Sequence, residues 1–199
     1  MANQWDDRYA RQEYIYGTEP NAFLKKQLGK LKPGRILFPA EGEGRNAVYA
    51  ASQGWITQAF DQSVEGQKKA LKLAEEKKVS ISYSILSLDD WNPEPGQYDC
   101  VALIFVHLPE GLRQKVHQAA ITALKPGGIL ILQAFTINQL PRNSGGPKTA
   151  DLLFTKNLIE KDFDTLINLD INEVKVELDE GPLHQGLADV IQLTARKSG

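Results

Sequence analysis

A strand, a glycine-rich turn and a helix are predicted in succession at residues 35–50, which read RILFPAEGEGRNAVYA. The apolar run breaks at Pro39, and apolar residues resume with helical spacing after Arg45. Gly42 and Gly44 have no Cβ, so the backbone can take positive φ there and a ligand can approach the main chain closely. Free N–H groups at the start of the helix favour a polar or anionic group at the same place. The turn can therefore hold a nucleotide, although a helix-entry turn without a ligand has the same Gly-x-Gly-x-x-Ala pattern.

An acidic residue follows the next predicted strand, at residues 55–60. Asp61 lies 17 residues after Gly44, close to the spacing of about 20 in dinucleotide folds. In a doubly wound sheet this position lies beside the glycine turn, where a carboxylate can accept both hydroxyl hydrogens of a ribose. The alternative is that Asp61 caps the helix predicted at 64–77. Because Ser63 can cap that helix instead, we favour ribose binding.

Length and composition predict one domain. The chain has 199 residues, 42% of them hydrophobic, which suffices for one well-packed core. We expect a single domain over 1–199, with an N-terminal helical lid at 1–34 and the core at 35–199. Lys and Arg total 23 against 25 Asp and Glu, a net charge of −2, so neither nucleic acid nor a membrane surface is an expected partner. The sequence shows no signal-like or membrane-spanning apolar stretch, so we expect a cytoplasmic location. We also expect a monomer or a weak homodimer.

The single cysteine and the three histidines show no metal-ligand spacing, so no metal is expected. Cys100 lies in an apolar run and is predicted to be a buried thiol. His117 lies in an amphipathic helix and is predicted to be a surface residue. His107 follows the strand predicted at 99–106, at the carboxyl end where ligands bind in open α/β sheets. It is a candidate general base or hydrogen-bond donor, or a cap for the next helix.

The segment before the first strand is rich in aromatic residues. One interpretation is a helix packed on the edge of the domain by Trp5 and Tyr9. The other is a lid that closes a pocket with Arg8, Tyr14 and Tyr16. The sequence leaves both open.

The rest of the chain predicts further strands and helices. Trp91, in a polar loop, is predicted to be exposed, where it can meet an adenine ring or pin the loop. The long polar loop at 138–151 is predicted to form a pocket wall. Strands are expected at 79–85, 129–135, 171–178 and 188–195, and helices at 110–124 and 157–162. The last two strands have a short connection, which makes them antiparallel.

Several segments together resemble the class I S-adenosylmethionine-dependent methyltransferases. These are FPAEGEGRN at 38–46, Asp61 at a strand end, LKPGG at 124–128 and the closing antiparallel pair. The resemblance is closest to the tellurite-resistance and thiopurine methyltransferase group, which has segments similar to WDDRY, YGTEPN, HLP and SGGP of this chain.

This resemblance implies an α/β fold, a doubly wound Rossmann-like sheet of seven mostly parallel strands in the order 3-2-1-4-5-7-6. It also implies S-adenosylmethionine as cofactor, S-adenosylhomocysteine as product, and His184 as the catalytic residue, with His107 as a second candidate. Gln185 stands where that group has an arginine, and Phe38 stands where it has an acid that helps hold the cofactor's ammonium group. The cofactor-binding residues expected are Arg8, Tyr16, Pro39, Ala40, Glu41, Gly42, Gly44, Asn46, Asp61, Gln62, Leu88, Asp89 and Phe105.

The function expected is methyl transfer from S-adenosylmethionine to a small-molecule nucleophile, such as a thiol or a soft anion like tellurite or selenite. One alternative is a nicotinamide-dependent oxidoreductase, because the glycine pattern and Asp61 permit it. Another is a non-catalytic nucleotide-binding module, which Phe38 suggests.

Overall fold

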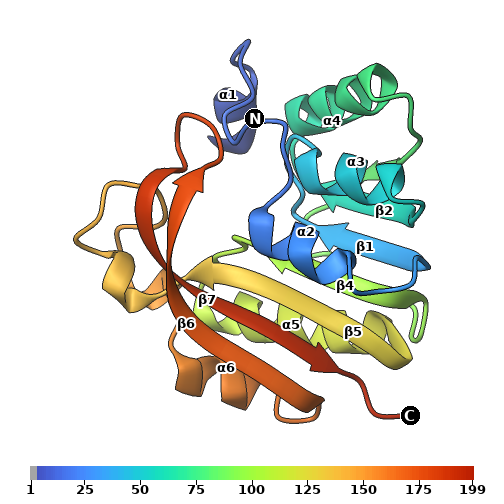
Figure 1. Cartoon of the computed structure of the whole chain (residues 1–199), viewed down its shortest axis with the longest axis vertical. Helices are drawn as coiled ribbons and strands as arrows, with labels where there is room; N and C mark the ends of the chain where they lie inside the picture. Colours follow the sequence, from blue (N-terminus) through green and yellow to red (C-terminus); the bar gives the residue numbers. More distant parts are fainter. Residues whose placement is uncertain (1–3) are drawn as a thin grey trace.

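The structure is a computed structural model that describes residues 4–199; the first three residues of the predicted lid lie outside this range. One sheet runs through the molecule in the order β3-β2-β1-β4-β5-β7-β6 (Figure 1). The predicted seven-strand order is therefore confirmed. The strands are β1 (Arg35–Pro39), β2 (Ile56–Asp61), β3 (Ser82–Ile85), β4 (Tyr98–Ile104), β5 (Leu124–Phe135), β6 (Ile167–Asp179) and β7 (Gln185–Arg196).

Strands β1 to β5 pair in parallel, whereas β7 runs antiparallel to both β5 and β6. The predicted antiparallel pair at the end of the chain is thus confirmed. The connecting helices are α1 (Gln4–Tyr9), α2 (Ala22–Leu28), α3 (Arg45–Ser52), α4 (Val64–Glu76), α5 (Glu110–Ala123) and α6 (Lys156–Asp162), with 3-10 turns η1 (Ile137–Gln139) and η2 (Ala150–Leu152).

Helices cover both faces of the sheet because successive side chains of a strand point to opposite faces. In β1, Ile36 and Phe38 face a core formed with α2 and α3. Leu37 faces the other core, formed with α5 and α6. Cys100 is fully buried, as predicted. The C-terminal ends of β1, β2, β4 and β5 consequently meet at one edge of a rigid, double-sided core.

Every strand after β1 begins at a residue other than the predicted one: β5 differs by five residues, β6 by four, β3 and β7 by three, and β2 and β4 by one. β3 starts at Ser82, not at 79, because the Val79 N–H donates to the Ala74 carbonyl and extends the turn after α4. β5 starts at Leu124, because Leu124 pairs with Tyr98 before a register shift. Pairing with the distant residue Tyr98 thus sets the start of β5, whereas a local turn after α4 sets the start of β3.

His117 was predicted to lie on the surface, but its side chain is buried. Its Nδ1 lies 2.8 Å from Asp162 Oδ2, and Arg113 Nε donates to the same oxygen at 2.8 Å. The ring also stacks on Phe163, with centroids 4.5 Å apart. His117 therefore belongs to a polar clamp between α5 and α6.

The tip of the β6–β7 hairpin reaches the N-terminal segment (Figure 1). The Leu183 N–H donates to the Ile15 carbonyl at 3.4 Å, and Gly17 packs directly against Gly181. The N-terminal segment and the β6–β7 hairpin tip therefore meet at the edge where the strands end, whereas the C-terminus lies far from it (Figure 1). Within residues 4–199, every helix is too short or too polar to cross a membrane.

Candidate active site

The glycine turn after β1 is packed too tightly to accept side chains. Gly42 and Gly44 have φ of +64° and +89°. A Cβ on Gly42 would lie 2.5 Å from the Tyr9 hydroxyl, and one on Gly44 would lie 2.5 Å from the Ala70 Cβ of α4. Ala40 also takes a positive φ, +52°, which costs a non-glycine residue roughly 1–2 kcal/mol. The turn is thus a strained, closely packed loop whose residues 42–46 are buried.

Asp61 holds the turn from the adjacent strand. Its Oδ2 accepts the Gly42 N–H at 3.1 Å and its Oδ1 accepts the Ser63 N–H at 2.9 Å. Ser63 caps α4 by accepting the Gly66 N–H, so Asp61 does not serve as that cap. Burial raises the pKa of Asp61, against its backbone hydrogen bonds. A carboxylate has about four lone-pair sites, so these bonds leave room for the ribose contact predicted from the sequence.

Phe38 stands where the similar group has an acid, so we asked whether Glu41 or Glu43 beside the turn is free to take the place of that acid. Phe38 is buried in the core with α2 and α3 and does not face the turn. Glu43 is also committed, since it accepts the Ile15 and Tyr16 N–H groups and pairs with Lys69 at 2.8 Å. Glu41 remains: its Oε1 accepts the N–H groups of Asn46 and Ala47 at the start of α3, and burial raises its pKa to about 7.

The N-terminal segment packs against this edge, with contacts that belong to each of the two interpretations. Arg8 donates to the Tyr16 hydroxyl at 3.0 Å, and the Tyr16 ring lies 4.6 Å from that of His184. Tyr9 is buried over the turn, which belongs to the edge-packing interpretation. Tyr14 instead donates to the Lys69 carbonyl on α4. Arg8 and Tyr16 therefore lie on the side of His184, whereas Tyr14 lies against α4.

His184 lies in an aromatic cage at the hairpin tip. Its ring is 4.6 Å from Phe105, which follows β4, and 5.3 Å from Phe135, at the end of β5. Phe105 adopts φ of +56°, and such strain clusters at functional sites. A Cβ on Gly145 would lie 2.7 Å from His184 Cδ2, so the predicted wall at 138–151 touches the ring. The cage thus gathers two strand ends, the N-terminal segment and the wall around His184.

Two residues of this region, Arg45 and Glu180, escaped the sequence-based prediction. Arg45 Nη2 donates to Glu180 Oε2 at 2.8 Å, and the two side chains are 7% and 10% exposed. Arg45 Nη1 is buried with no hydrogen-bond partner among the described residues. Asn46 accepts the Asn21 N–H at 2.9 Å, which makes it a support for the lid. Only the pairing across the fold, not local spacing, could reveal the Arg45–Glu180 link.

His107 lacks a free ring nitrogen, so the geometry disfavours its predicted role as a general base. Its Nδ1 lies 2.8 Å from the Leu152 carbonyl, which only accepts, and its Nε2 accepts the Phe135 N–H at 3.3 Å. The ring is therefore neutral with its proton on Nδ1, and burial lowers its pKa. His107 holds the end of β5 and the wall, and it does not cap α5.

The segment expected beside the adenine follows β3. Leu88 is half-buried, whereas Asp89 and Gln62 are exposed. Trp91 is buried, contrary to the prediction, because its ring packs on Phe60 at 5.3 Å. Trp91 therefore pins the loop and leaves Leu88 as the apolar side chain on this side.

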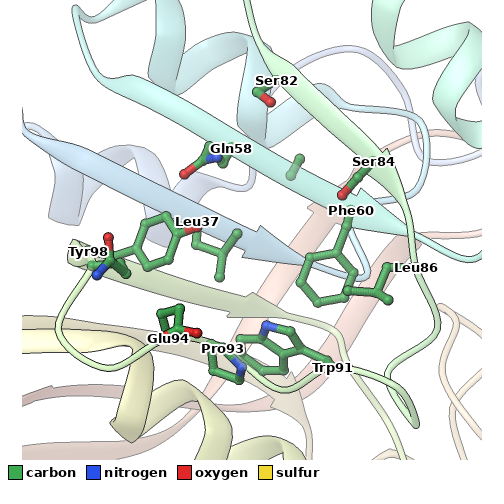
Figure 2. A pocket seen from close by; sticks show the side chains of 12 residues that line it. Leu37, Gln58, Phe60, Ser82, Ser84, Leu86, Trp91, Pro93, Glu94 and Tyr98 are labelled. Atoms are coloured by element: carbon green, nitrogen blue, oxygen red, sulfur yellow. The ribbon is translucent and has the colours of Figure 1, made fainter.

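A separate groove of about 320 Å³ lies on the face of the sheet that α5 also covers. Figure 2 shows it between β2 and β3 on one side and the loop before β4 on the other. Of the residues singled out in the sequence, only Trp91 lines it. The lining residues include Gln58, Ser82, Ser84, Trp91, Glu94 and Tyr98.

A family model described as a methyltransferase domain matches residues 36–128. No curated protein sequence matches the chain. A solved structure concerned with the conversion of a disulfide bond into a thioacetal group during echinomycin biosynthesis has a TM-score of 0.78 and 13% identity, over 98% of this chain and 90% of that one.

TehB from Haemophilus influenzae has a TM-score of 0.74 and 16% identity, over 98% of this chain and 66% of that one. Phosphoethanolamine N-methyltransferase 2 from Haemonchus contortus, in complex with S-adenosyl-L-methionine, has a TM-score of 0.73 and 16% identity, over 100% of this chain and 61% of that one. The chain thus spans about two thirds or less of these two proteins. The likenesses establish the fold, and together with the domain match they support a methyltransferase enzyme.

Proposed function

We propose that this methyltransferase moves a methyl group from S-adenosylmethionine to a small-molecule nucleophile. One observation carries the proposal: Arg45, next to the glycine turn, pairs with Glu180, which in turn contacts His184 in its aromatic cage. This link joins the glycine turn, which suits a nucleotide, to His184, which suits a methyl acceptor, at one edge of the sheet. The comparisons give no support to a nicotinamide-dependent oxidoreductase.

The side chains around the turn fit the two ends of such a cofactor. Asp61 would accept the ribose hydroxyls, and Leu88, Asp89 and Gln62 would border the adenine. The methionine end carries an ammonium and a carboxylate group. Glu41, whose pKa is raised to about 7 by burial, gains from a nearby cation, and the unpaired Arg45 Nη1 suits a carboxylate.

The remaining predicted contacts are main-chain and lid contacts. Pro39 and Ala40 would offer backbone carbonyls, and Gly42 and Gly44 would let the ligand approach. Arg8, Tyr16 and Phe105 would close the methyl side of the site. Asn46 would act indirectly, through Asn21 of the lid.

Bound S-adenosylmethionine supplies a methyl group already activated by its sulfonium charge. The acceptor lone pair forms the new bond to the methyl carbon while the carbon–sulfur electrons return to sulfur. Alignment of two reactants is worth about 7–11 kcal/mol, whereas a general base contributes about 10²–10⁴ in rate. The cage of Tyr16, Phe105 and Phe135 therefore matters chiefly by orienting the acceptor and excluding water, with His184 as the base when the acceptor must lose a proton.

For the acceptor we favour a thiol or a soft anion. The segments shared with the tellurite-resistance and thiopurine group and the likeness to TehB support this choice. The site also holds Arg8 and Arg45 against the single carboxylate of Glu180 around His184, which favours an anionic acceptor. Gln185 is exposed at the start of β7 and would leave the acceptor without the arginine that the group usually provides.

Calorimetric titration with S-adenosylhomocysteine tests the proposal, with NADH as the competing ligand. We expect saturable binding of S-adenosylhomocysteine alone. Asp61→Ala should weaken it about tenfold to a hundredfold, since a hydrogen bond to a charged group is worth roughly 1.5–3 kcal/mol. Asp164→Ala, at an exposed position after α6, is the matched control and should bind normally. Binding of NADH without S-adenosylhomocysteine, or of neither, would refute the proposal.

A further inference from the structure

Glu180 is shared by three side chains from distant parts of the chain. Its Oε2 accepts from Arg45 Nη2 at 2.8 Å and lies 3.4 Å from His184 Nδ1, and its Oε1 accepts from Asn21 Nδ2 at 2.9 Å. The side chains of Glu180 and His184 are 10% and 8% exposed. Burying a carboxylate and its arginine counterion costs desolvation free energy. Stability alone therefore does not explain the pair, and a functional role is the better account.

The partners of Glu180 fix its charge and the tautomer of His184. Burial alone would raise the pKa of Glu180, but the His184 hydrogen bond and the Arg45 charge lower it to about 2. An ionised carboxylate only accepts hydrogen bonds, so the proton on the His184 ring must lie on Nδ1. Burial lowers the pKa of His184 despite Glu180, which leaves the ring neutral near pH 7 with a lone pair on Nε2.

The geometry leaves Nε2 available. It has no hydrogen-bond partner among residues 4–199, and it lies beside the predicted wall, where a Cβ on Gly145 would be 3.3 Å from it. In contrast, Nε2 of His107 is taken by the Phe135 N–H. Of the two predicted bases, only His184 can take a proton.

We propose that Glu180 is a positioning residue that holds His184 in the Nδ1-protonated tautomer and so presents Nε2 to the methyl acceptor. This inference rests on the proposed function. When the acceptor gives up its proton, the proton bonds to Nε2 and the electron pair of the broken bond stays on the acceptor atom that takes the methyl group. Glu180 then stabilises the resulting imidazolium, and Arg45 ties the pair to the glycine turn.

Nitrogen NMR of the wild-type protein labelled at histidine tests the tautomer without cofactor or substrate. The chain has only three histidines, and His184→Gln identifies the signals of His184. We expect the Nδ1-protonated neutral form at pH 7.5. An Nε2-protonated ring, or an imidazolium, would overturn the proposal. Because no ligand is present, this result is independent of whether S-adenosylhomocysteine binds.

A charge-neutral variant then tests the role in turnover with an acceptor found by screening thiols and oxyanions. Glu180→Gln should lower kcat about 10–100-fold, the loss typical when the partner that orients a histidine is removed, with little change in the acceptor KM. Asp179→Asn, the same change at the exposed neighbouring residue, should leave kcat intact.

The pH profile separates positioning from a structural role. The charged or titratable groups around His184 are Glu180, Arg45, Arg8, Tyr16 and His107. Removing the only anion among them lowers the pKa of His184 further, so the acid limb of kcat should move to lower pH in Glu180→Gln. An acid limb at the wild-type position would overturn the proposal. If Glu180→Gln does not fold, the wild-type NMR result decides alone.

Discussion

Gly44 and Gly54 flank α3 and have nearly the same backbone conformation, with φ of +89° and +87°, but different surroundings. A Cβ on Gly44 would lie 2.5 Å from Ala70 Cβ and 2.7 Å from Ala70 Cα, whereas one on Gly54 would have nothing within 4 Å. The pair therefore separates backbone strain from close packing at the turn.

Gly54→Ala should cost only the strain of positive φ, about 1–2 kcal/mol of unfolding free energy. Gly44→Ala should cost the same strain plus the displacement of α4 from the turn, where overpacking adds typically 1–3 kcal/mol. Urea denaturation of both variants measures the difference. Equal losses would mean that α4 moves away freely and that the turn is not held rigidly.

Individual residues were predictable where their partners are near in sequence. The pattern around Asp61 and Ser63 predicts that Ser63 caps α4, which the structure confirms; the ribose contact of Asp61 stays a prediction. His117 was misread because its partner, Asp162, lies 45 residues away, and Glu180 was missed because Arg45 lies 135 residues away. A local pattern carries no information on which distant charge will neutralise a buried group.

At the scale of elements, α5 and α6 are joined by a desolvated clamp. The side chains of Arg113, His117 and Asp162 are 6%, 4% and 4% exposed. Asp162→Asn leaves the Arg113 charge buried without its counterion, so we expect a loss of about 3–5 kcal/mol in unfolding free energy. Glu160→Gln breaks only the exposed ion pair with Lys156 on the same helix and should change stability by no more than about 0.5 kcal/mol.

The pH dependence of this loss follows from the direction of the pKa shift. Burial raises the pKa of Asp162, but His117 and Arg113 outweigh it, so the net pKa is lowered. Its stabilisation is complete above the unfolded pKa of about 3.9 and is lost as pH falls through the lower folded pKa. The stability difference between wild type and Asp162→Asn should therefore shrink below about pH 4. A constant difference between pH 3 and pH 7 would contradict this account.

Elements themselves were largely predictable, because apolar periodicity and glycine or proline breaks mark the α/β alternation. The glycine turn, α4 and the closing strand pair were predicted from such signals together with the family resemblance. The start of β5 at Leu124 was not, because a lysine, a proline and two glycines follow it and only the pairing with Tyr98 makes it a strand. Trp91 was misplaced for a related reason: its loop is polar, and its burial depends on Phe60 of another strand.

At the scale of the whole molecule, the N-terminal segment and the β6–β7 hairpin tip meet over the candidate site. The Asn21 side chain donates to Glu180 at 2.9 Å, the Leu183 N–H donates to the Ile15 carbonyl, and Glu43 beside the glycine turn accepts the Ile15 N–H at 2.8 Å. Lid, hairpin tip and turn are thus connected by hydrogen bonds, so they should open and close as one unit.

Hydrogen–deuterium exchange with and without S-adenosylhomocysteine tests this cooperation. A ligand that binds only the closed form stabilises it by about 2.7 kcal/mol at 100 times its Kd, so amide exchange at 12–21 and 180–187 should slow together by up to about a hundredfold. Residues 156–162 of α6 are the internal control and should be unaffected. Protection of the lid without the hairpin tip would show that the links through Asn21 and Ile15 do not couple them, and that the lid alone closes the site.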